Sequence, residues 1–200
     1  LDGNNGANTG GMGCISPSPF MNDELKNTVM QKVVQPTIDG LNKLGIHYYG
    51  FMYFGLMVKD NNPKVLEFNC RLGDPETQCL MMQMESDLVD CLTDALKNNK
   101  VTINWKKGAS MGVVIASDGY PGRYAINKQI SFGDTKNLKV FHAGTKSTNG
   151  VLQTSGGRVF SVNYHGETLD LCSKYIYKNI EEVQFDGNIY RKDIGKIYES

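Results

Sequence analysis

VLEFNCRLGDPETQ, residues 65–78, decides the fold because it changes from a strand pattern to the start of a helix within a few residues. Side chains alternate between the two faces of a strand, so we expect Glu67 and Asn69 to share one face. A carboxylate and an amide oxygen at this spacing can bind one divalent cation, and their hard oxygens suit Mg²⁺ better than Zn²⁺. The alternating apolar residues, which we expect to face a core, are Leu66, Phe68 and Cys70.

The residues after this strand bring charged groups to the start of a helix. Arg71 carries a planar guanidinium that suits phosphate oxygens. Asp74, Pro75 and Glu76 are typical of a first helical turn, with Asp74 as the cap. Two interpretations stay open for Asp74, a cap alone or a cap that also binds a ligand. A structural ion pair of Arg71 with Asp74 or Glu76 is the alternative to phosphate binding.

A glycine-rich stretch, DGNNGANTGGMG, occupies residues 2–13. Backbone N–H groups in such a loop can converge on an anion, and the missing Cβ atoms let a ligand come close. A flexible surface turn is the alternative, because glycine and asparagine are common in turns. The length and polarity of the stretch favour a ligand loop. It is not a Walker loop, because no Gly-Lys-Ser/Thr follows it.

The composition is that of a globular chain: 200 residues, 40% of them hydrophobic, with 21 basic and 21 acidic side chains. This balanced charge gives no support to binding of nucleic acid or of an acidic membrane. Five cysteines without a CxxC pair predict reduced, buried thiols in a cytoplasmic protein. No apolar run reaches the roughly 20 residues that span a bilayer. A dense motif directly after Leu1 leads us to expect the C-terminal part of a longer polypeptide, with an N-terminal part missing.

Hydrophobic periodicity predicts an α+β chain with an antiparallel sheet and helices, in two domains, 1–104 and 105–200. The elements expected in the first domain are a helix from Asn22 or Asp23 to Gly45 interrupted at Pro36, a buried strand over 46–58, a turn over 59–63, a helix to about Met84 and another capped by Ser86. The second domain is expected to contain strands over 109–116, 128–132, 139–145, 151–154 and 158–166, a Ser/Thr/Asn/Gly turn between the third and fourth of them, and a helix over 168–180.

Six motifs in order carry a resemblance to a known family: DGNNGANTGGMG, LEFNCRLGDPETQ, GYPG, HAGT, GGRV and YRKDIG. Together they resemble the phosphoribosylamine–glycine ligases, ATP-grasp enzymes of purine synthesis, over essentially the whole chain. The resemblance implies the C-terminal half of an ATP-grasp fold followed by a small α+β domain. It also implies a reaction in which ATP activates glycine as glycyl phosphate and the nitrogen of 5-phosphoribosylamine displaces the phosphate.

The resemblance implies roles for residues at the matching positions. Glu67 and Asn69 would bind Mg²⁺ or Mn²⁺ beside the phosphates of ATP, and Arg71 would stabilise the transferred phosphoryl group. Asp74 and Glu76 would complete the catalytic set by holding the glycine amine or orienting the second substrate. The loop residues that would bind the substrates are Asp2, Asn8, Thr9, Gly10 and Gly11.

Some features depart from the family pattern. Asn4 and Ala7 stand where the family usually has aspartate and proline. The family's N-terminal domain and adenine-binding lobe are not among these 200 residues, so we expect the chain alone to have little or no ligase activity. A truncated, non-catalytic binding or assembly module is the alternative, whereas RLGDPETQ disfavours an ATP-grasp carboxylase or another purine ligase. Arg158 and Arg191 are compatible with a sugar phosphate, but nothing distinguishes them from ordinary surface arginines.

Overall fold

The computed structural model describes residues 1–196, and the chain divides into two compact units. The first unit contains Leu1–Ser16, Asp74–Glu85 and the residues from Asn104 on, and the second contains Pro17–Gly73 and Ser86–Ile103. This division by contacts is interleaved along the chain, whereas the predicted domains, 1–104 and 105–200, follow chain order. The predicted domains therefore stay a prediction.

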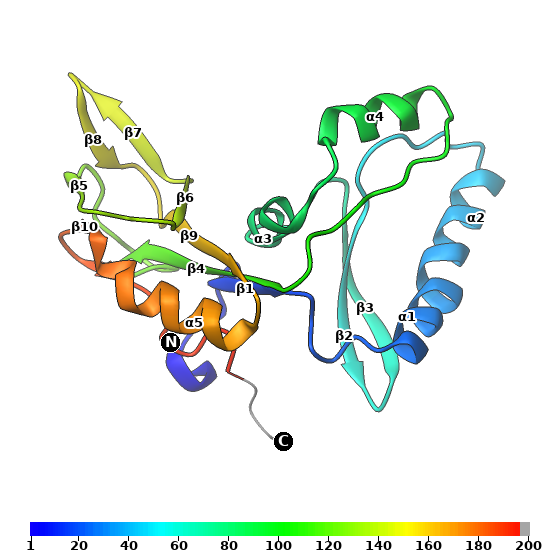
Figure 1. The fold of residues 1–200 in the computed structure, drawn as a ribbon, viewed down its shortest axis with the longest axis horizontal. Helices are drawn as coiled ribbons and strands as arrows, with labels where there is room; N and C mark the ends of the chain where they lie inside the picture. The colour runs from blue at the N-terminus through cyan, green and yellow to red at the C-terminus, as the bar shows by residue number, and fades with distance from the viewer. Residues whose placement is uncertain (197–200) are drawn as a thin grey trace. The chain divides into compact units, whose positions relative to one another are not determined.

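An antiparallel sheet forms the centre of the first unit, with strand order β1–β4–β9–β6 and β11 paired to β4 (Figure 1). Its strands are β1 (Gly13–Ser16), β4 (Ala109–Ser117), β6 (Lys139–His142), β9 (Arg158–Gly166) and β11 (Asn188–Ile189). The longest two strands, β4 and β9, are predicted almost to the residue because continuous apolar runs between glycine turns are typical of central strands.

Helices pack on both faces of this sheet. Met111 on β4 faces the hydrophobic core with Cys172 and Ile176 of helix α5 (Leu169–Asn179), and all three are completely buried. Helix α3 (Glu76–Gln83) covers the other face, where Gly112 lets the Cys79 thiol approach the strand. Figure 1 shows α3 and α5 on opposite sides of β4 and β9. The apolar area buried on both faces is the main stabilising contribution in this unit.

Two small two-stranded sheets extend the first unit. Strand β5 (Ile130–Phe132) pairs with β10 (Val183–Phe185), and β7 (Thr145–Thr148) pairs with β8 (Val151–Thr154). The prediction of β8 is confirmed. The prediction of a turn over the whole Ser/Thr/Asn/Gly segment is wrong, because only Asn149 and Gly150 turn the chain, both with positive φ, while Thr145–Thr148 is a strand.

The second unit contains one long helical stretch. It consists of α1 (Asp23–Val29), the π-helical turn η2 (Met30–Val34) and α2 (Gln35–Lys43). Asn22 is the N-cap, and its side-chain oxygen accepts a 2.7 Å hydrogen bond from the Leu25 amide. The π-helical turn ends at Val34, two residues before Pro36, which cannot donate a helical hydrogen bond, so the helix continues past the proline with an irregular turn. Gly45, with φ +69°, follows its end as predicted.

Strands β2 (Tyr53–Lys59) and β3 (Asn62–Asn69) of the second unit form an antiparallel hairpin. Its turn is Asp60–Asn61, both with positive φ, which confirms the predicted turn. The predicted strand over 46–58 is wrong for residues 46–52, which are irregular. The expectation that alternate apolar residues of β3 face a core is also wrong. Leu66 is 64% exposed, Phe68 is 54% exposed and Cys70 is exposed.

The remaining helix of the second unit is α4 (Leu88–Leu96). Its N-cap is Asp87, whose carboxylate accepts hydrogen bonds from the amides of Val89 and Asp90, so the prediction of Ser86 as the cap is wrong by one residue. All five cysteines are free, as predicted, but only Cys79 and Cys172 are buried. Within residues 1–196 no helix combines the length and the apolar character needed to cross a membrane.

Candidate active site

The glycine-rich loop, residues 2–13, leads directly into the central sheet of the first unit. Its last residues join the sheet, because the carbonyl of Met12 accepts a 2.9 Å hydrogen bond from the Val114 amide and Gly13 is the first residue of β1. A Cβ atom at Gly13 would lie 2.7 Å from the carbonyl oxygen of Gly112. A glycine at this position is therefore required by the close approach of two strands.

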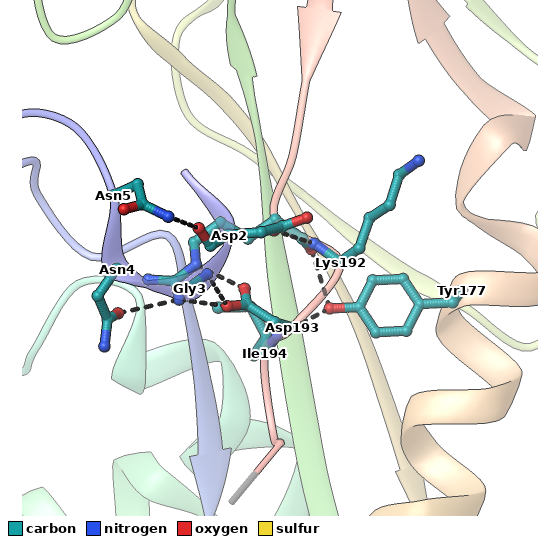
Figure 2. Close-up of polar contacts among 9 residues, drawn as sticks. Asp2, Gly3, Asn4, Asn5, Tyr177, Lys192, Asp193 and Ile194 are labelled. Atoms are coloured by element: carbon teal, nitrogen blue, oxygen red, sulfur yellow. Dashed lines mark hydrogen bonds and ion pairs between the residues drawn. The ribbon is translucent and has the colours of Figure 1, made fainter. Parts of the chain in front are cut away.

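The beginning of the loop is bound by the YRKDIG segment near the end of the described chain. Figure 2 shows the carboxylate of Asp193 between the loop and a guanidinium. One oxygen accepts a 2.8 Å hydrogen bond from the Gly3 amide, and both oxygens accept 2.7 Å bonds from Arg191. Arg191 also donates to the side-chain oxygen of Asn4 at 3.0 Å. Asp193 is only 5% exposed, so this is a buried, bidentate ion pair.

Two further contacts complete this anchor (Figure 2). The carboxylate of Asp2 accepts a 2.8 Å hydrogen bond from the Lys192 amide. The Tyr177 hydroxyl donates to the carbonyl of Arg191 at 2.9 Å and accepts from the Ile194 amide at 3.1 Å. Burial raises the pKa of Tyr177 to about 12, so its phenol stays protonated and can donate at neutral pH.

The other end of the loop is bound by a second arginine. Arg158 donates to the carbonyl of Gly11 at 3.0 Å, to the carbonyl of Asp74 at 3.2 Å and to the carboxylate of Asp74 at 2.7 Å. The Tyr120 hydroxyl accepts a 3.1 Å hydrogen bond from the Gly10 amide. The loop is therefore held at both ends, by two different arginine–carboxylate pairs.

Local sequence explains why these groups can meet. A Cβ atom at Gly11 would lie 2.4 Å from Cδ of Pro75, and one at Gly157 would lie 2.2 Å from the Tyr120 ring. Both glycines thus allow close approaches that any other residue would block. A register shift between β4 and β9 places Arg158 opposite Ala116, the position that regular pairing would give to the next residue of β9. Bulges of this kind change the direction of side chains beside functional sites.

A cavity of about 600 Å³ lies beside the loop. Three segments of the first unit line it: the loop, the turn that contains GYPG, and β11 with the residues that follow it. Among its lining residues are Asp2, Thr9, Asp118, Tyr120 and Arg191, so carboxylate, hydroxyl and guanidinium groups all reach it. The cavity is large enough for a small molecule, and its lining combines these polar residues with a larger apolar surface.

The predicted site residues fall into both units. Asp2, Asn8, Thr9, Gly10 and Gly11 lie on the loop, and the first unit brings Gly10 and Gly11 together with Asp74. The prediction that Asp74 caps helix α3 is wrong: Pro75 occupies the cap position, no side chain caps the helix, and the Asp74 carboxylate binds Arg158. Glu76 is the first residue of α3.

Glu67, Asn69 and Arg71 belong to the second unit. Glu67 and Asn69 lie two residues apart at the end of β3, paired with Gly55 and Tyr53 of β2. A Cβ atom at Gly55 would lie 2.8 Å from Cγ of Glu67, so the glycine makes room for this carboxylate. Arg71 donates to the carbonyl of Leu72 at 3.0 Å.

These residues fit a hard divalent cation by donor type and placement. The side-chain nitrogen of Asn69 is buried and has no hydrogen-bond partner among residues 1–196, so this amide still has an unused hydrogen-bonding group. Within the same described residues no cluster of three or more His, Cys, Asp or Glu side chains could hold a metal. A cation bound by Glu67 and Asn69 would need water or phosphate oxygens to complete its shell, which is the usual situation of Mg²⁺.

Sequence reasoning missed Tyr120 and Asp193, and it considered Arg158 and Arg191 without distinguishing them from ordinary surface arginines. Each lies within a motif noted in the sequence, GYPG, GGRV or YRKDIG, but the motifs are far apart in the chain. Only the fold brings them to one loop. An arginine directly after two glycines was the available signal for Arg158, because glycines next to a polar residue often mark a close approach of backbone.

Comparison with known proteins places this geometry in a family. Residues 1–77 match the phosphoribosylglycinamide synthetase ATP-grasp (A) domain, and residues 110–197 match the C domain of the same synthetase. The chain is 45% identical over 198 residues to the phosphoribosylamine–glycine ligase of Clostridium acetobutylicum, covering 98% of this chain and 48% of that protein. The chain spans about half the length of the curated relatives it matches.

Solved structures agree with this assignment. The crystal structure of a phosphoribosylamine–glycine ligase from Thermotoga maritima superimposes with a TM-score of 0.87 at 34% identity, over 96% of this chain and 48% of that one. The biotin carboxylase domain of Hydrogenobacter thermophilus 2-oxoglutarate carboxylase, described in complex with MgADP, superimposes with a TM-score of 0.64 at 17% identity, over 90% of this chain and 40% of that one, which shows a shared fold. With both synthetase domains matched in order, the chain belongs to the phosphoribosylglycinamide synthetase family and contains part of its ATP-grasp domain and its C domain.

Proposed function

We propose that this chain is the C-terminal part of an ATP-dependent ligase that joins glycine to 5-phosphoribosylamine. The observation that carries the proposal is the pair Glu67 and Asn69 at the end of β3, with Gly55 leaving room for the carboxylate. The reading is supported by the 45% identity to the Clostridium ligase over nearly the whole chain. The missing N-terminal part of the same polypeptide would supply the remainder of the ATP site.

Glu67 and Asn69 would hold the metal, Mg²⁺ or Mn²⁺. A bound divalent cation neutralises charge on the phosphates of ATP during phosphoryl transfer. The Glu67 side chain supplies the negative charge that attracts the cation, and Asn69 supplies a neutral oxygen that adds a ligand without adding charge. A neutral amide at position 69 would attract the cation less strongly than a second carboxylate would.

Arg71 would stabilise negative charge on the transferred phosphoryl group. Arg71 is exposed, and within residues 1–196 its guanidinium donates one hydrogen bond, to a neighbouring carbonyl, so most of its five donors remain available to a ligand. Asp74 would not serve as a helix cap, because its carboxylate accepts a hydrogen bond from Arg158 and is held in position by it. Glu76, in the first turn of α3, would orient the glycine amine or the second substrate.

The glycine loop would bind the phosphoribosylamine. Thr9 and Asp2 line the 600 Å³ cavity beside it, and sugar hydroxyls pair well with carboxylate and hydroxyl groups of this kind. Asn8, Gly10 and Gly11 lie on the same loop and line an adjoining hollow of about 380 Å³. Two anchored ends reduce the entropy that the loop would lose on binding a substrate.

The test is substitution of Glu67 in the full-length enzyme that contains this chain. We expect Glu67→Gln to lower kcat for glycinamide ribonucleotide formation by at least 100-fold, on the scale of lost charge stabilisation in phosphoryl transfer. Binding of Mn²⁺, followed by electron paramagnetic resonance, should weaken in the same variant. Thermal stability should change little, because Glu67 is exposed.

The matched control is Glu24→Gln, which alters the same type of side chain in the same unit, where Glu24 accepts a hydrogen bond from Asn61. It should leave both kcat and Mn²⁺ binding unchanged. Unchanged turnover of Glu67→Gln at saturating Mg²⁺ would contradict the metal role. A full-length wild-type protein that forms no glycinamide ribonucleotide from ATP, glycine and phosphoribosylamine would favour the alternative, a non-catalytic binding or assembly module.

A further inference from the structure

Arg158 connects two motifs that are far apart in the sequence. Its guanidinium donates to the carbonyl of Gly11 in the glycine loop and to both the carbonyl and the carboxylate of Asp74 in RLGDPE. These acceptors precede Arg158 by 147 and 84 residues.

Neighbouring residues hold the side chain of Arg158 in this position. A Cβ atom at Gly10 would lie 3.1 Å from Cζ of Arg158 and 3.1 Å from the Tyr120 hydroxyl, so the loop passes directly over the guanidinium. The side chain of Arg158 is 23% exposed, which limits the rotamers available to it. The register shift at the start of β9 gives it its direction. These features distinguish it from an ordinary surface arginine, whose ion pair contributes little.

We propose that Arg158 is a positioning residue: it holds the glycine loop against Asp74, so that the middle of the loop, residues 6–9, forms a fixed wall of the cavity. This inference rests on the proposed function, because it assigns the loop to substrate binding. Arg158 does so through geometry that only a guanidinium has. Its planar fork reaches two carbonyls and one carboxylate at once, whereas a lysine ammonium carries a point charge on a flexible stem.

The mechanism predicts a kinetic pattern. When Arg158 is lost, Asp74 and the loop can each move by an ångström or more, and misplacement of that size costs on the order of 10- to 100-fold in rate. We therefore expect Arg158→Gln in the full-length enzyme to lower kcat by about this factor and to raise KM for phosphoribosylamine, while KM for ATP stays unchanged. Arg158→Lys should recover only a small part of kcat, because it restores the charge but not the fork.

The decisive readout is hydrogen exchange, because it needs no activity. In Arg158→Gln, amides of residues 10–13, 74 and 76–78 should exchange at least about tenfold faster, while those of β4 and the rest of β9 keep the wild-type rate. The matched control is Lys128→Gln, which removes the exposed ion pair with Asp186 in the same unit. It should change neither the exchange of these segments nor kcat.

Two results would overturn the inference. One is an exchange pattern in Arg158→Gln that matches the wild type at residues 10–13. The other is uniformly faster exchange across the first unit with normal kcat for the folded fraction, which would make Arg158 a stabilising residue only. If the wild-type enzyme makes no glycinamide ribonucleotide, the proposed function fails, but the exchange measurement still decides whether Arg158 holds the loop.

Discussion

Replacement of Asp193 by asparagine tests the anchor at the start of the glycine loop. Both oxygens of the native carboxylate accept hydrogen bonds from Arg191, and one of them also accepts from the Gly3 amide. Asp193→Asn keeps the shape but replaces one acceptor by an NH₂ group. That donor must face either the guanidinium or the backbone amide, both of which are donors themselves, and Arg191 loses its counter-charge.

The loss of stability expected in Asp193→Asn depends on how deeply the Asp193–Arg191 ion pair is buried. Removing one partner from a buried ion pair costs about 3–5 kcal/mol, because the other charge is left without compensation. The Asp193 side chain is 4% exposed but that of Arg191 is 21% exposed, so water can partly solvate the guanidinium and the lower end of the range applies. We expect a loss of about 3 kcal/mol in the free energy of unfolding of the first unit, or roughly 6–12 °C in its melting temperature.

The assay is thermal unfolding of the full-length protein, combined with hydrogen exchange at residues 2–5. The amide of Gly3 should lose its protection in Asp193→Asn even well below the melting temperature. Asp186→Asn is the matched control, since it removes the carboxylate of an exposed ion pair in the same unit and should leave the melting temperature unchanged. A melting temperature of Asp193→Asn within about 2 °C of the wild type would refute the assignment of this ion pair as a structural anchor.

Three further substitutions test close packing, pH dependence and capping. Gly11→Ala places a methyl group 2.4 Å from Pro75 and should cost about 1–3 kcal/mol in unfolding experiments, whereas Gly40→Ala in helix α2, with nothing within 4 Å, should be neutral or stabilise slightly. Since folding raises the pKa of Tyr177 from 10.0 to about 12, its protonated phenol stabilises the fold fully below pH 10, and this contribution is lost as the pH rises toward 12. Tyr177→Phe should flatten that part of the stability–pH curve, and wild-type stability that stays constant from pH 9 to 11.5 would contradict the burial of the phenol. Thr168→Ala removes the N-cap of α5 and should lower stability by about 1 kcal/mol in denaturant titrations, with an unchanged midpoint as the contrary result.

The sequence predicts best where local pattern and tertiary context agree. The boundaries of β8 and β9 are predicted because short apolar runs between glycine turns have one stable solution in an antiparallel sheet. Helix α5 is predicted because its apolar residues recur at helical spacing, and the structure adds Thr168 as its N-cap. The family resemblance is likewise confirmed by matches to both synthetase domains.

The errors have a common physical cause. An apolar run such as residues 46–52 reads as a buried strand, yet strand formation needs a partner, and β2 begins only at Tyr53. The Thr145–Thr148 strand was missed because Ser, Thr and Asn favour turns, and pairing with β8 overrides that preference. Asp74 reads as a helix cap, but its carboxylate binds Arg158, 84 residues later. Such long-range competition leaves no trace in local sequence.

The RLGDPE motif supplies side chains to both units of the structure. Arg71 and Asp74 are three residues apart, but they belong to different units and have different neighbours. Each residue is explained by contacts within its own unit, because Arg71 donates to the Leu72 carbonyl and the Asp74 carboxylate accepts from Arg158. A local pattern treats the two residues as one turn between a strand and a helix, whereas the fold gives them separate partners. The motif is therefore a poor guide to local structure, since one short stretch supplies side chains to two units.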